Sequence, residues 1–376
     1  MAKILIFSNT YYPVVGQYAI KEITDRLSEH EYYLITNRSE ASWPEKEKIG
    51  NINIRRIGHG KKKDKFLFPF RALGYAARLH KHTNFDFVWS RRAFYSGLVA
   101  LFFKYKTKVP YLLTPEFEDV DRDVHNKIWL WSYFYKRIFR EAKITQGITR
   151  YLAKRSRNFG NKKEIVLIPD GVDLQIFKNK LSDPDRQQTR KDVGIKDNEM
   201  FLITRFGTRE TLEELVKSIN WLVFKIGIQA KLVVLGVETD EENLKHKAEA
   251  VSVDDRVIFL QSVSDQEISK YLEAADVFVR PDTIPTSGKS FLQAMAVGTP
   301  IVGTEIGGTI DFLKDGQTGL FCQVNKPSSL AEAVEKYFKD KELYKSIGQN
   351  CKQFVTEKYS WDRVVDQMNL VFEKML

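Results

Sequence analysis

Val277–Asp311, VFVRPDTIPTSGKSFLQAMAVGTPIVGTEIGGTID, is the stretch that decides the fold of this chain. It begins with an apolar run that predicts a buried strand, continues through a polar loop rich in Pro, Thr and Ser, and enters a helix over 288–296. Gly298 follows that helix as its C-cap, and a second apolar strand begins at Pro300. A strand, a helix and a second strand form a βαβ unit, so the stretch predicts a parallel sheet covered by helices.

The loop over 282–287 is expected at the carboxyl end of the first strand, where open parallel sheets bind their ligands. Thr286 or Ser287 can cap the helix that follows. The first turn of this helix offers backbone N–H groups and one ammonium group, which together suit an anion. The residues that present these groups are Gly288, Lys289, Ser290 and Phe291. The sequence therefore predicts a phosphate-binding site at this place.

The length of 376 residues predicts two α/β domains rather than one core. Cys322 and Cys351 give neither a disulfide framework nor a metal-ligand spacing, which favours a reducing compartment. No apolar run approaches the roughly 20 residues that span a bilayer, and the chain enters a strand at Lys3 without a signal peptide. We expect a cytoplasmic protein with no metal site, and peripheral attachment to a membrane is an open alternative.

The net charge of +10 fits a nucleic acid, an anionic membrane or a phosphorylated substrate as partner. No nucleic-acid-binding module is recognisable, so we expect no nucleic acid partner. Much of the charge lies in the segment 55–71, where basic residues precede Phe66, Phe68 and Phe70. Two interpretations remain open: an interfacial anchor for an anionic membrane surface, or a solvated loop before a helix whose aromatic residues face the core.

The N-terminal half starts with a strand over 3–8, a helix over 19–27 and a strand over 32–36. This is a Rossmann-like start without the G-x-G-x-x-G fingerprint, so no dinucleotide cofactor is implied. The polar stretch 178–198 predicts a linker, and the strand over 201–204 opens the second half.

The stretch 277–311 resembles the donor-binding segment of retaining GT-B-fold glycosyltransferases, the glycosyl transferases of group 1 and family 4. The matching positions are Pro281, Gly288, Ala294, Met295, Ala296, Gly298, Pro300, Ile301, Val302, Thr304, Gly307 and Gly308. Pro285 and Gln293 stand where the family pattern has its two glutamates.

Other segments carry the resemblance over almost the whole chain. Gly16 matches a loop that approaches the donor diphosphate in the family, with Gln17 in place of a second glycine. The segment 168–173, IPDGVD, is similar to the signature at the domain junction, and 358–362, KYSWD, to the start of the terminal helix. The resemblance implies a GT-B fold, with two Rossmann-like βαβ domains whose parallel sheets face each other across an interdomain cleft. The expected parts are an acceptor domain over 1–170, a donor domain over 171–355 and a helix over 356–376 that crosses back.

The resemblance also implies roles for particular residues. Arg205 and Arg209 would hold the leaving diphosphate without a metal, although an ion pair of Arg209 with Glu210 or Glu213 is the alternative. Gln293 would donate to or accept from a ribose hydroxyl. Glu116 follows a strand after which the family often has a histidine, so it would serve as a base or bind acceptor hydroxyls. The alternative is a structural role, in which Glu116 places a negative charge ahead of the N-terminus of the next helix, and it explains Glu116 equally well.

Taken together, these features predict a retaining glycosyltransferase that moves a sugar from a UDP- or GDP-linked donor to a sugar or lipid-linked acceptor, with no further cofactor. The departures from the family pattern gather where the chemistry is expected. The alternative is therefore a GT-B scaffold that is catalytically weak or silent and acts as a binding or structural protein. A P-loop is excluded, because Thr283 stands where its first glycine is needed.

Overall fold

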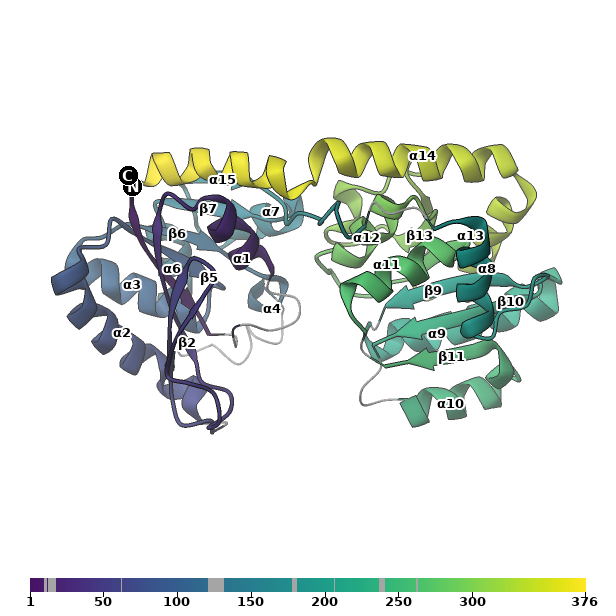
Figure 1. Cartoon of the computed structure of the whole chain (residues 1–376), viewed down its shortest axis with the longest axis horizontal. Helices are drawn as coiled ribbons and strands as arrows, with labels where there is room; N and C mark the ends of the chain where they lie inside the picture. The colour runs from purple at the N-terminus through teal and green to yellow at the C-terminus, as the bar shows by residue number, and fades with distance from the viewer. Residues whose placement is uncertain are drawn as a thin grey trace. The chain divides into compact units, whose positions relative to one another are not determined.

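The computed structural model describes residues 1–9, 12, 18–61, 63–120, 132–177, 181–205, 207–236, 241–261 and 263–376. It divides into two compact units (Figure 1). Unit 1 consists of Met1–Gly171 and Trp361–Leu376, and unit 2 consists of Val172–Ser360. Each unit holds a largely parallel sheet between helices, which confirms the α/β class and the Rossmann-like character expected of both halves.

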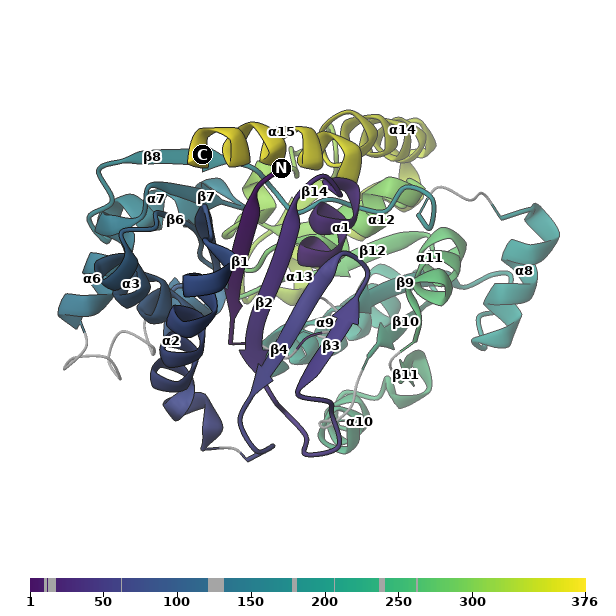
Figure 2. The ribbon, with the colours of Figure 1, turned by 60° about the vertical axis from the view of Figure 1, so that its left-hand side comes forward.

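The sheet of unit 1 has the order β3-β4-β2-β1-β5-β6-β7-β8. All neighbours are parallel except β3, which runs antiparallel to β4 at the edge that Figure 2 brings forward. The strands are β1 Lys3–Ser8, β2 Glu31–Asn37, β3 Lys46–Ile49, β4 Ile52–Ile57, β5 Phe87–Arg91, β6 Tyr111–Thr114, β7 Ile144–Gly147 and β8 Glu164–Leu167.

Helices cover both faces of this sheet. Alternate residues of β1 point to opposite faces, and both sets are apolar, so both faces need to be buried. Ile4 and Ile6 lie in the core under α1 and α15, whereas Leu5 and Phe7 lie in the core under α2, α3 and α6. The last helix, α15, belongs to unit 1, where the ring of Phe372 packs against Phe87 and Trp89. The helices are α1 Tyr18–Arg26, α2 Asp64–Thr83, α3 Tyr95–Thr107, α4 Phe117–Val120, α6 Ser132–Glu141, α7 Arg150–Asn158 and α15 Trp361–Met375.

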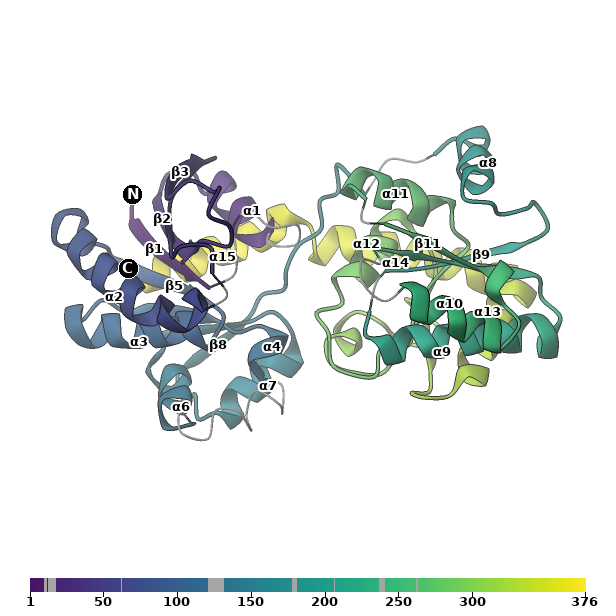
Figure 3. The same cartoon turned by 90° about the horizontal axis from the view of Figure 1, so that it is seen from below.

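The sheet of unit 2 has the order β11-β10-β9-β12-β13-β14, with every neighbouring pair parallel. Helices α8, α11, α12 and α14 pack together on one side, and α9, α10 and α13 on the other (Figure 3). The strands are β9 Met200–Arg205, β10 Ala230–Leu235, β11 Val257–Leu260, β12 Val277–Arg280, β13 Ile301–Thr304 and β14 Leu320–Cys322. The helices are α8 Asp183–Asp192, α9 Arg209–Asn220 with a π turn over Trp221–Ile226, α10 Glu241–Ala250, α11 Asp265–Ala274, α12 Lys289–Val297, α13 Pro327–Lys339 and α14 Lys341–Lys358.

The stretch 277–311 forms the predicted βαβ unit. Strands β12 and β13 pair in parallel, with Phe278 opposite Ile301. Helix α12 ends at Gly298, whose φ of +84° is the left-handed conformation that a glycine C-cap supplies. The prediction from the sequence is confirmed at each of these points.

One local expectation is wrong, and one of the two open interpretations of segment 55–71 fits only in part. The polar stretch 178–198 contains helix α8, which Ser182 caps by accepting from the N–H of Asp185. This helix is held by Arg186 and Arg190, which both pair with Asp276, a tertiary contact that composition does not reveal. The aromatic residues of segment 55–71 do not all face the core either. Phe68 is fully buried, but Phe66 and Phe70 are 57% and 71% exposed on the first half of α2.

Among the described residues, no helix combines the length and apolar character needed to span a bilayer.

Candidate active site

The candidate site lies in unit 2, where the carboxyl ends of β9, β12 and β13 meet the start of α12. Arg205 is the last residue of β9 and Arg280 is the last residue of β12. The two strands pair directly and in parallel, so both arginines lie at the same edge of the sheet. This edge is the place at which a doubly wound sheet binds its ligands.

Two residues expected from the sequence, Arg205 and Gln293, are in direct contact. The Nη1 atom of Arg205 donates to Oε1 of Gln293 at 2.7 Å. Gln293 lies on the inner side of α12 and is only 1% exposed, so its amide is fixed in place. The amide orients the guanidinium without neutralising its charge, because a carboxamide is a neutral acceptor.

A second arginine, Arg280, joins the loop after β12 to helix α12. Its Nε atom lies 2.8 and 3.0 Å from the two carboxylate oxygens of Asp282, and its Nη1 donates to the hydroxyl of Ser290 at 2.9 Å. Asp282 is 1% exposed and the side chain of Arg280 is 14% exposed, so the carboxylate is buried and the pair is largely shielded from solvent. Sequence reasoning missed both Arg280 and Asp282. The signal was their spacing: side chains at positions i and i+2 of an extended segment point to the same side.

The loop over 282–287 is tied to its surroundings at several points. The hydroxyl of Thr304 donates to the carbonyl of Asp282 at 2.6 Å, and the hydroxyl of Thr286 donates to its carboxylate at 2.8 Å. Gly307 has a φ of +60° and lies so close to the loop that an added Cβ would come within 2.6 Å of Cα of Pro285. The Gly-Gly turn therefore supports the loop by close backbone approach.

The start of α12 differs from the expected cap. The N-cap is Gly288, and no side chain in the described part of the chain caps the helix. Thr286 does not act as the cap, because its hydroxyl is bonded to Asp282. A helix that begins without a side-chain cap keeps its N-terminal dipole for another acceptor, and an anion satisfies that requirement.

The four residues of this first turn contribute in different ways. Gly288 has a φ of +71°, and an added Cβ would lie 2.4 Å from the ring of Phe312, so glycine is required. Phe291 is fully buried against Phe278 and Phe312, so only its backbone is available to a ligand. The hydroxyl of Ser290 is used by Arg280. Lys289 is half-buried at the first helical position.

Arg209 is placed less favourably than Arg205. It is the first residue of α9, and its Nε atom donates to Glu213 at 3.1 Å on the same helix. The ion pair left open as an alternative by the sequence is thus present. The side chain of Arg209 is 49% exposed, and the carboxylate of Glu213 offsets much of its charge.

Glu116 lies in unit 1, after β6, in a cluster of charged residues. Its carboxylate pairs with Arg92 at 2.7 Å and with Arg91 at 3.3 Å. The neighbouring Asp119 is buried and accepts the backbone N–H groups of Ala93 and Glu116 at 2.7 and 2.9 Å. Burial raises the pKa of Asp119 to about 6, although these N–H groups act in the opposite direction.

Two predicted residues, Gly16 and Gln17, lie outside the described part of the chain. In the part that is described, no three histidine, cysteine or acidic side chains gather in a way that would hold a metal ion.

Comparison with known proteins bears on both units. Residues 185–354 match the family model for glycosyl transferases group 1, and residues 19–176 match the model for glycosyltransferase family 4. The chain belongs to these glycosyltransferases. The two matches meet in the linker region and together span nearly all of both sheets.

Two uncharacterized glycosyltransferases of Methanocaldococcus jannaschii are similar to this one. The first is 27% identical over 212 residues, which is 56% of this chain and 54% of that relative, so this match spans about half of each protein. The second is 23% identical over 376 residues and covers 99% of this chain and 98% of the relative.

Solved structures share the fold of this glycosyltransferase. Sucrose-phosphate synthase from Thermosynechococcus elongatus has a TM-score of 0.85 at 18% identity, over 100% of this chain and 99% of that one. HepE of Anabaena, in a complex with UDP-glucose, has a TM-score of 0.81 at 14% identity, over 100% of both chains. These likenesses confirm the GT-B fold.

Proposed function

We propose that this glycosyltransferase is a retaining hexosyltransferase that transfers a sugar from a UDP- or GDP-linked donor to an acceptor hydroxyl without a metal. The observation that carries the proposal is Arg205, which Gln293 holds at 2.7 Å beside the uncapped start of α12. The complex of HepE with UDP-glucose supports a nucleotide-linked donor, because it has the same fold.

The chemistry requires that negative charge on the leaving diphosphate be stabilised as the glycosidic bond breaks. The guanidinium of Arg205 presents a planar set of N–H donors that matches phosphate oxygens. The backbone N–H groups of Ser290 and Phe291, in the first turn of α12, add the positive end of the helix dipole. Together they perform the role that a divalent cation performs in metal-dependent transferases.

Gln293 has a second role in this proposal. Its Oε1 atom is used by Arg205, so its Nε2 hydrogen atoms are the ones that can donate to a ribose hydroxyl. A glutamate at this position would accept from that hydroxyl instead. Pro285, at the position of the other family glutamate, offers no polar side-chain atom and no backbone N–H, so sugar contacts here fall to the backbone of its neighbours.

On the acceptor side we propose Glu116. Arg91 and Arg92 hold its carboxylate in a fixed orientation from the end of β5 and the residue after it. Arg92 has a φ of +75°, an uncommon conformation for a residue with a side chain and one that is found at functional sites. A fixed carboxylate that accepts a hydrogen bond from an acceptor hydroxyl positions that oxygen for attack.

The experiment that tests this function is incubation of the full chain with a panel of UDP- and GDP-linked hexoses, with nucleotide release as the readout. We expect release from at least one donor, unchanged by a metal chelator, and a product whose anomeric configuration by NMR equals that of the donor. An inverted product would contradict the retaining mechanism. Donor binding without release from any donor would instead support the silent-scaffold alternative.

We also propose that the segment 55–71 meets an anionic membrane surface, which would favour a lipid-linked acceptor. Phe66, Leu67 and Phe70 are 57%, 45% and 71% exposed at the start of α2, next to exposed lysines at 61, 63 and 65. Exposed apolar side chains beside lysines are typical of interfacial helices. Sedimentation with phosphatidylcholine vesicles should increase when phosphatidylglycerol is added, and binding that does not depend on anionic lipid would contradict the proposal.

A further inference from the structure

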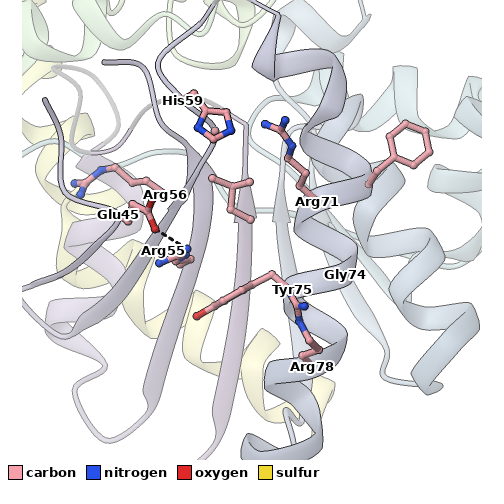
Figure 4. Close-up of a pocket in the computed structure, with 11 residues that line it drawn as sticks. Glu45, Arg55, Arg56, His59, Arg71, Gly74, Tyr75 and Arg78 are labelled. Carbon is pink, nitrogen blue, oxygen red and sulfur yellow. Dashed lines mark ion pairs between the residues drawn. The ribbon is translucent and has the colours of Figure 1, made fainter. Parts of the chain in front are cut away.

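A cavity of about 380 Å³ lies in unit 1, between the carboxyl end of β4 and the first half of α2 (Figure 4). All the residues that line it belong to unit 1, so it is separate from the site built on β9, β12 and α12. Its size falls in the range of small-molecule sites.

The cavity carries an excess of positive charge. Arg55, Arg56, Arg71 and Arg78 line it, against the single carboxylate of Glu45 among the described lining residues. Glu45 pairs with Nη2 of Arg55 at 2.7 Å, whereas the Nε atom of Arg55 is buried and has no hydrogen-bond partner in the described structure. Arg78 is exposed and has no ion pair with any described residue. An unpartnered buried donor and an unpaired guanidinium at one cavity both favour an anionic ligand.

Arg56 has a structural role in the wall of this cavity. Its side chain is 2% exposed, and its guanidinium donates to the carbonyl groups of Tyr12 and Pro44 and to the carboxylate of Glu47. These bonds satisfy the N–H groups of Arg56 within the protein. The other three arginines keep N–H groups for a ligand, because Arg55 and Arg71 each have a single carboxylate partner and Arg78 has no ion pair with a described residue.

The loop between β4 and α2 is fixed by Asp64, the first residue of α2. Asp64 accepts the N–H groups of His59 and Lys61 at 2.7 and 3.0 Å, and Arg71 donates to it at 2.8 Å. Burial alone would raise the pKa of Asp64, but these three donors hold it below its ordinary value. Gly58 has a φ of +121°, and an added Cβ would lie 2.9 Å from the Asp64 carboxyl carbon. The backbone of His59 in the loop and the guanidinium of Arg71 on α2 are thus tied to one carboxylate, and both side chains line the cavity (Figure 4).

One wall of the cavity is aromatic. The ring of Tyr75 extends from α2 towards β4, where the guanidinium of Arg55 lies 5.2 Å from its centroid (Figure 4). Ile57 adds an apolar side chain. A ligand that fills this space has an anionic group for the arginines and a less polar face for the tyrosine ring, as a sugar or another polyol ring has.

We infer that this cavity binds the phosphate ester of a sugar-sized polyol. Arginine side chains bind phosphate oxygens bidentately, and the planar fork of the guanidinium favours this chemistry over a simple monovalent anion. The phosphate ester is either that of a soluble sugar phosphate or that of a lipid headgroup. The inference rests on unit 1 alone and does not depend on the function proposed for unit 2.

Gly74 gives a clean test, because it lines the cavity from α2 and an added Cβ would meet nothing within 4 Å. Gly74→Glu places a carboxylate at the cavity without a packing clash, and Gly74→Gln is its neutral match in size. Both substitutions improve helix propensity, so neither is expected to unfold unit 1. Arg78→Gln removes a ligand group, and Lys81→Gln makes the same charge change one turn further along α2, outside the cavity.

The measurement is calorimetric titration of the full chain with glucose 6-phosphate and with glucose. We expect saturable binding of glucose 6-phosphate and none of glucose. Gly74→Glu and Arg78→Gln should each weaken this binding about tenfold, the value of one charge-assisted hydrogen bond, while Gly74→Gln and Lys81→Gln stay within about twofold.

A second arm uses phosphatidylcholine vesicles with and without phosphatidic acid, to distinguish the two sources. If the lipid headgroup is the ligand, vesicle binding falls in Gly74→Glu and Arg78→Gln but not in their matched controls. If glucose 6-phosphate binds no better than glucose and the vesicle binding of all four variants equals that of the wild type, the inference is overturned. Equal losses in Gly74→Glu and Gly74→Gln would also overturn it, since the effect would then be steric.

Discussion

The carboxyl edges of the two sheets use charge in different ways. In unit 2, Arg205 donates to the amide of Gln293, which is neutral and therefore does not offset its positive charge. In unit 1, Arg91 and Arg92 both pair with the carboxylate of Glu116, so much of their charge is offset within the protein. The first arrangement suits a diphosphate, and the second suits a neutral hydroxyl.

The buried carboxylates at the two edges also differ in the groups that pair with them. Asp282 is paired with a cation, Arg280, and fixes the loop before α12. Asp119 is held mainly by backbone N–H groups, which do not fully compensate its burial. The comparison shows that a strand end followed by an acidic residue does not specify one role, because the partner of the carboxylate decides it.

The largest effect is expected from breaking the ion pair in unit 2. Asp282→Ala removes the carboxylate partner of Arg280, whose side chain is only 14% exposed, and the acceptor of Thr286. Loss of one member of a buried pair costs about 3–5 kcal/mol, which should appear as a lower free energy of unfolding in urea. Asp362→Ala is the control, since Asp362 is 88% exposed and should change stability by less than about 0.5 kcal/mol. Equal effects of the two substitutions would contradict the structural role of Asp282.

A somewhat smaller effect is expected at the glycine that begins α12. Gly288→Ala adds a Cβ at 2.4 Å from the ring of Phe312 and at a φ of +71°, so conformational strain and overpacking together should cost about 2–4 kcal/mol. Gly316→Ala is the matched control, because Gly316 has a φ of +68° with nothing within 4 Å. It should cost only the strain, about 1 kcal/mol. If Gly288→Ala and Gly316→Ala lose the same free energy of unfolding in urea, the ring of Phe312 moves aside at no cost, which contradicts the prediction.

The Asp119 carboxylate predicts a pH dependence for unit 1. Its pKa of about 6 in the folded chain lies above the ordinary value of 3.8, so the native state binds the proton more tightly. The stability from this group is complete below pH 3.8 and is lost as the pH rises through about 6. The free energy of unfolding of the wild type should therefore fall relative to that of Asp119→Asn by on the order of 1–3 kcal/mol between these pH values. A difference between the two proteins that does not vary with pH would contradict this prediction.

The smallest effect tests the difference between the two edges directly. Gln293→Glu converts the edge of unit 2 into an arginine–carboxylate pair like that of Glu116, and so offsets the charge of Arg205. Affinity for UDP should fall severalfold, about 1 kcal/mol, and become less sensitive to salt. Tighter binding of UDP by Gln293→Glu would show instead that a carboxylate towards the ribose outweighs the charge of Arg205.

The sequence alone predicted the fold well because its signals are local. Buried parallel strands are continuous apolar runs, and Gly298 and Gly307 mark turns that other residues cannot adopt easily. It also predicted that Arg205 and Gln293 belong to one site, although only through the family resemblance, since 88 positions separate them.

The partners of charged residues were beyond reach of the sequence. The pair of Arg280 with Asp282 and the docking of α8 through Asp276 depend on rotamers and tertiary contacts, whereas the pair of Arg209 with Glu213, four positions apart on one helix, was among the alternatives that the sequence offers. For the basic segment 55–71 the sequence allows a membrane anchor or a solvated loop before a core-facing helix, but it does not indicate the cavity that forms where β4 and α2 place its arginines opposite one another. Charge composition reports how many cations there are and not which of them have partners.

The central claim, that Arg205 at the edge of unit 2 binds the diphosphate of a nucleotide donor, is tested most directly by calorimetric titration of UDP and UDP-glucose into the wild type, Arg205→Gln and Arg209→Gln. Glutamine at 205 keeps an amide that can bond to Gln293 and removes the positive charge. We predict that Arg205→Gln weakens binding about 100-fold, the upper range for hydrogen bonds to a charged group, while Arg209→Gln, whose arginine is already paired with Glu213, weakens it about threefold or less. Equal affinities of the wild type and Arg205→Gln would contradict the claim.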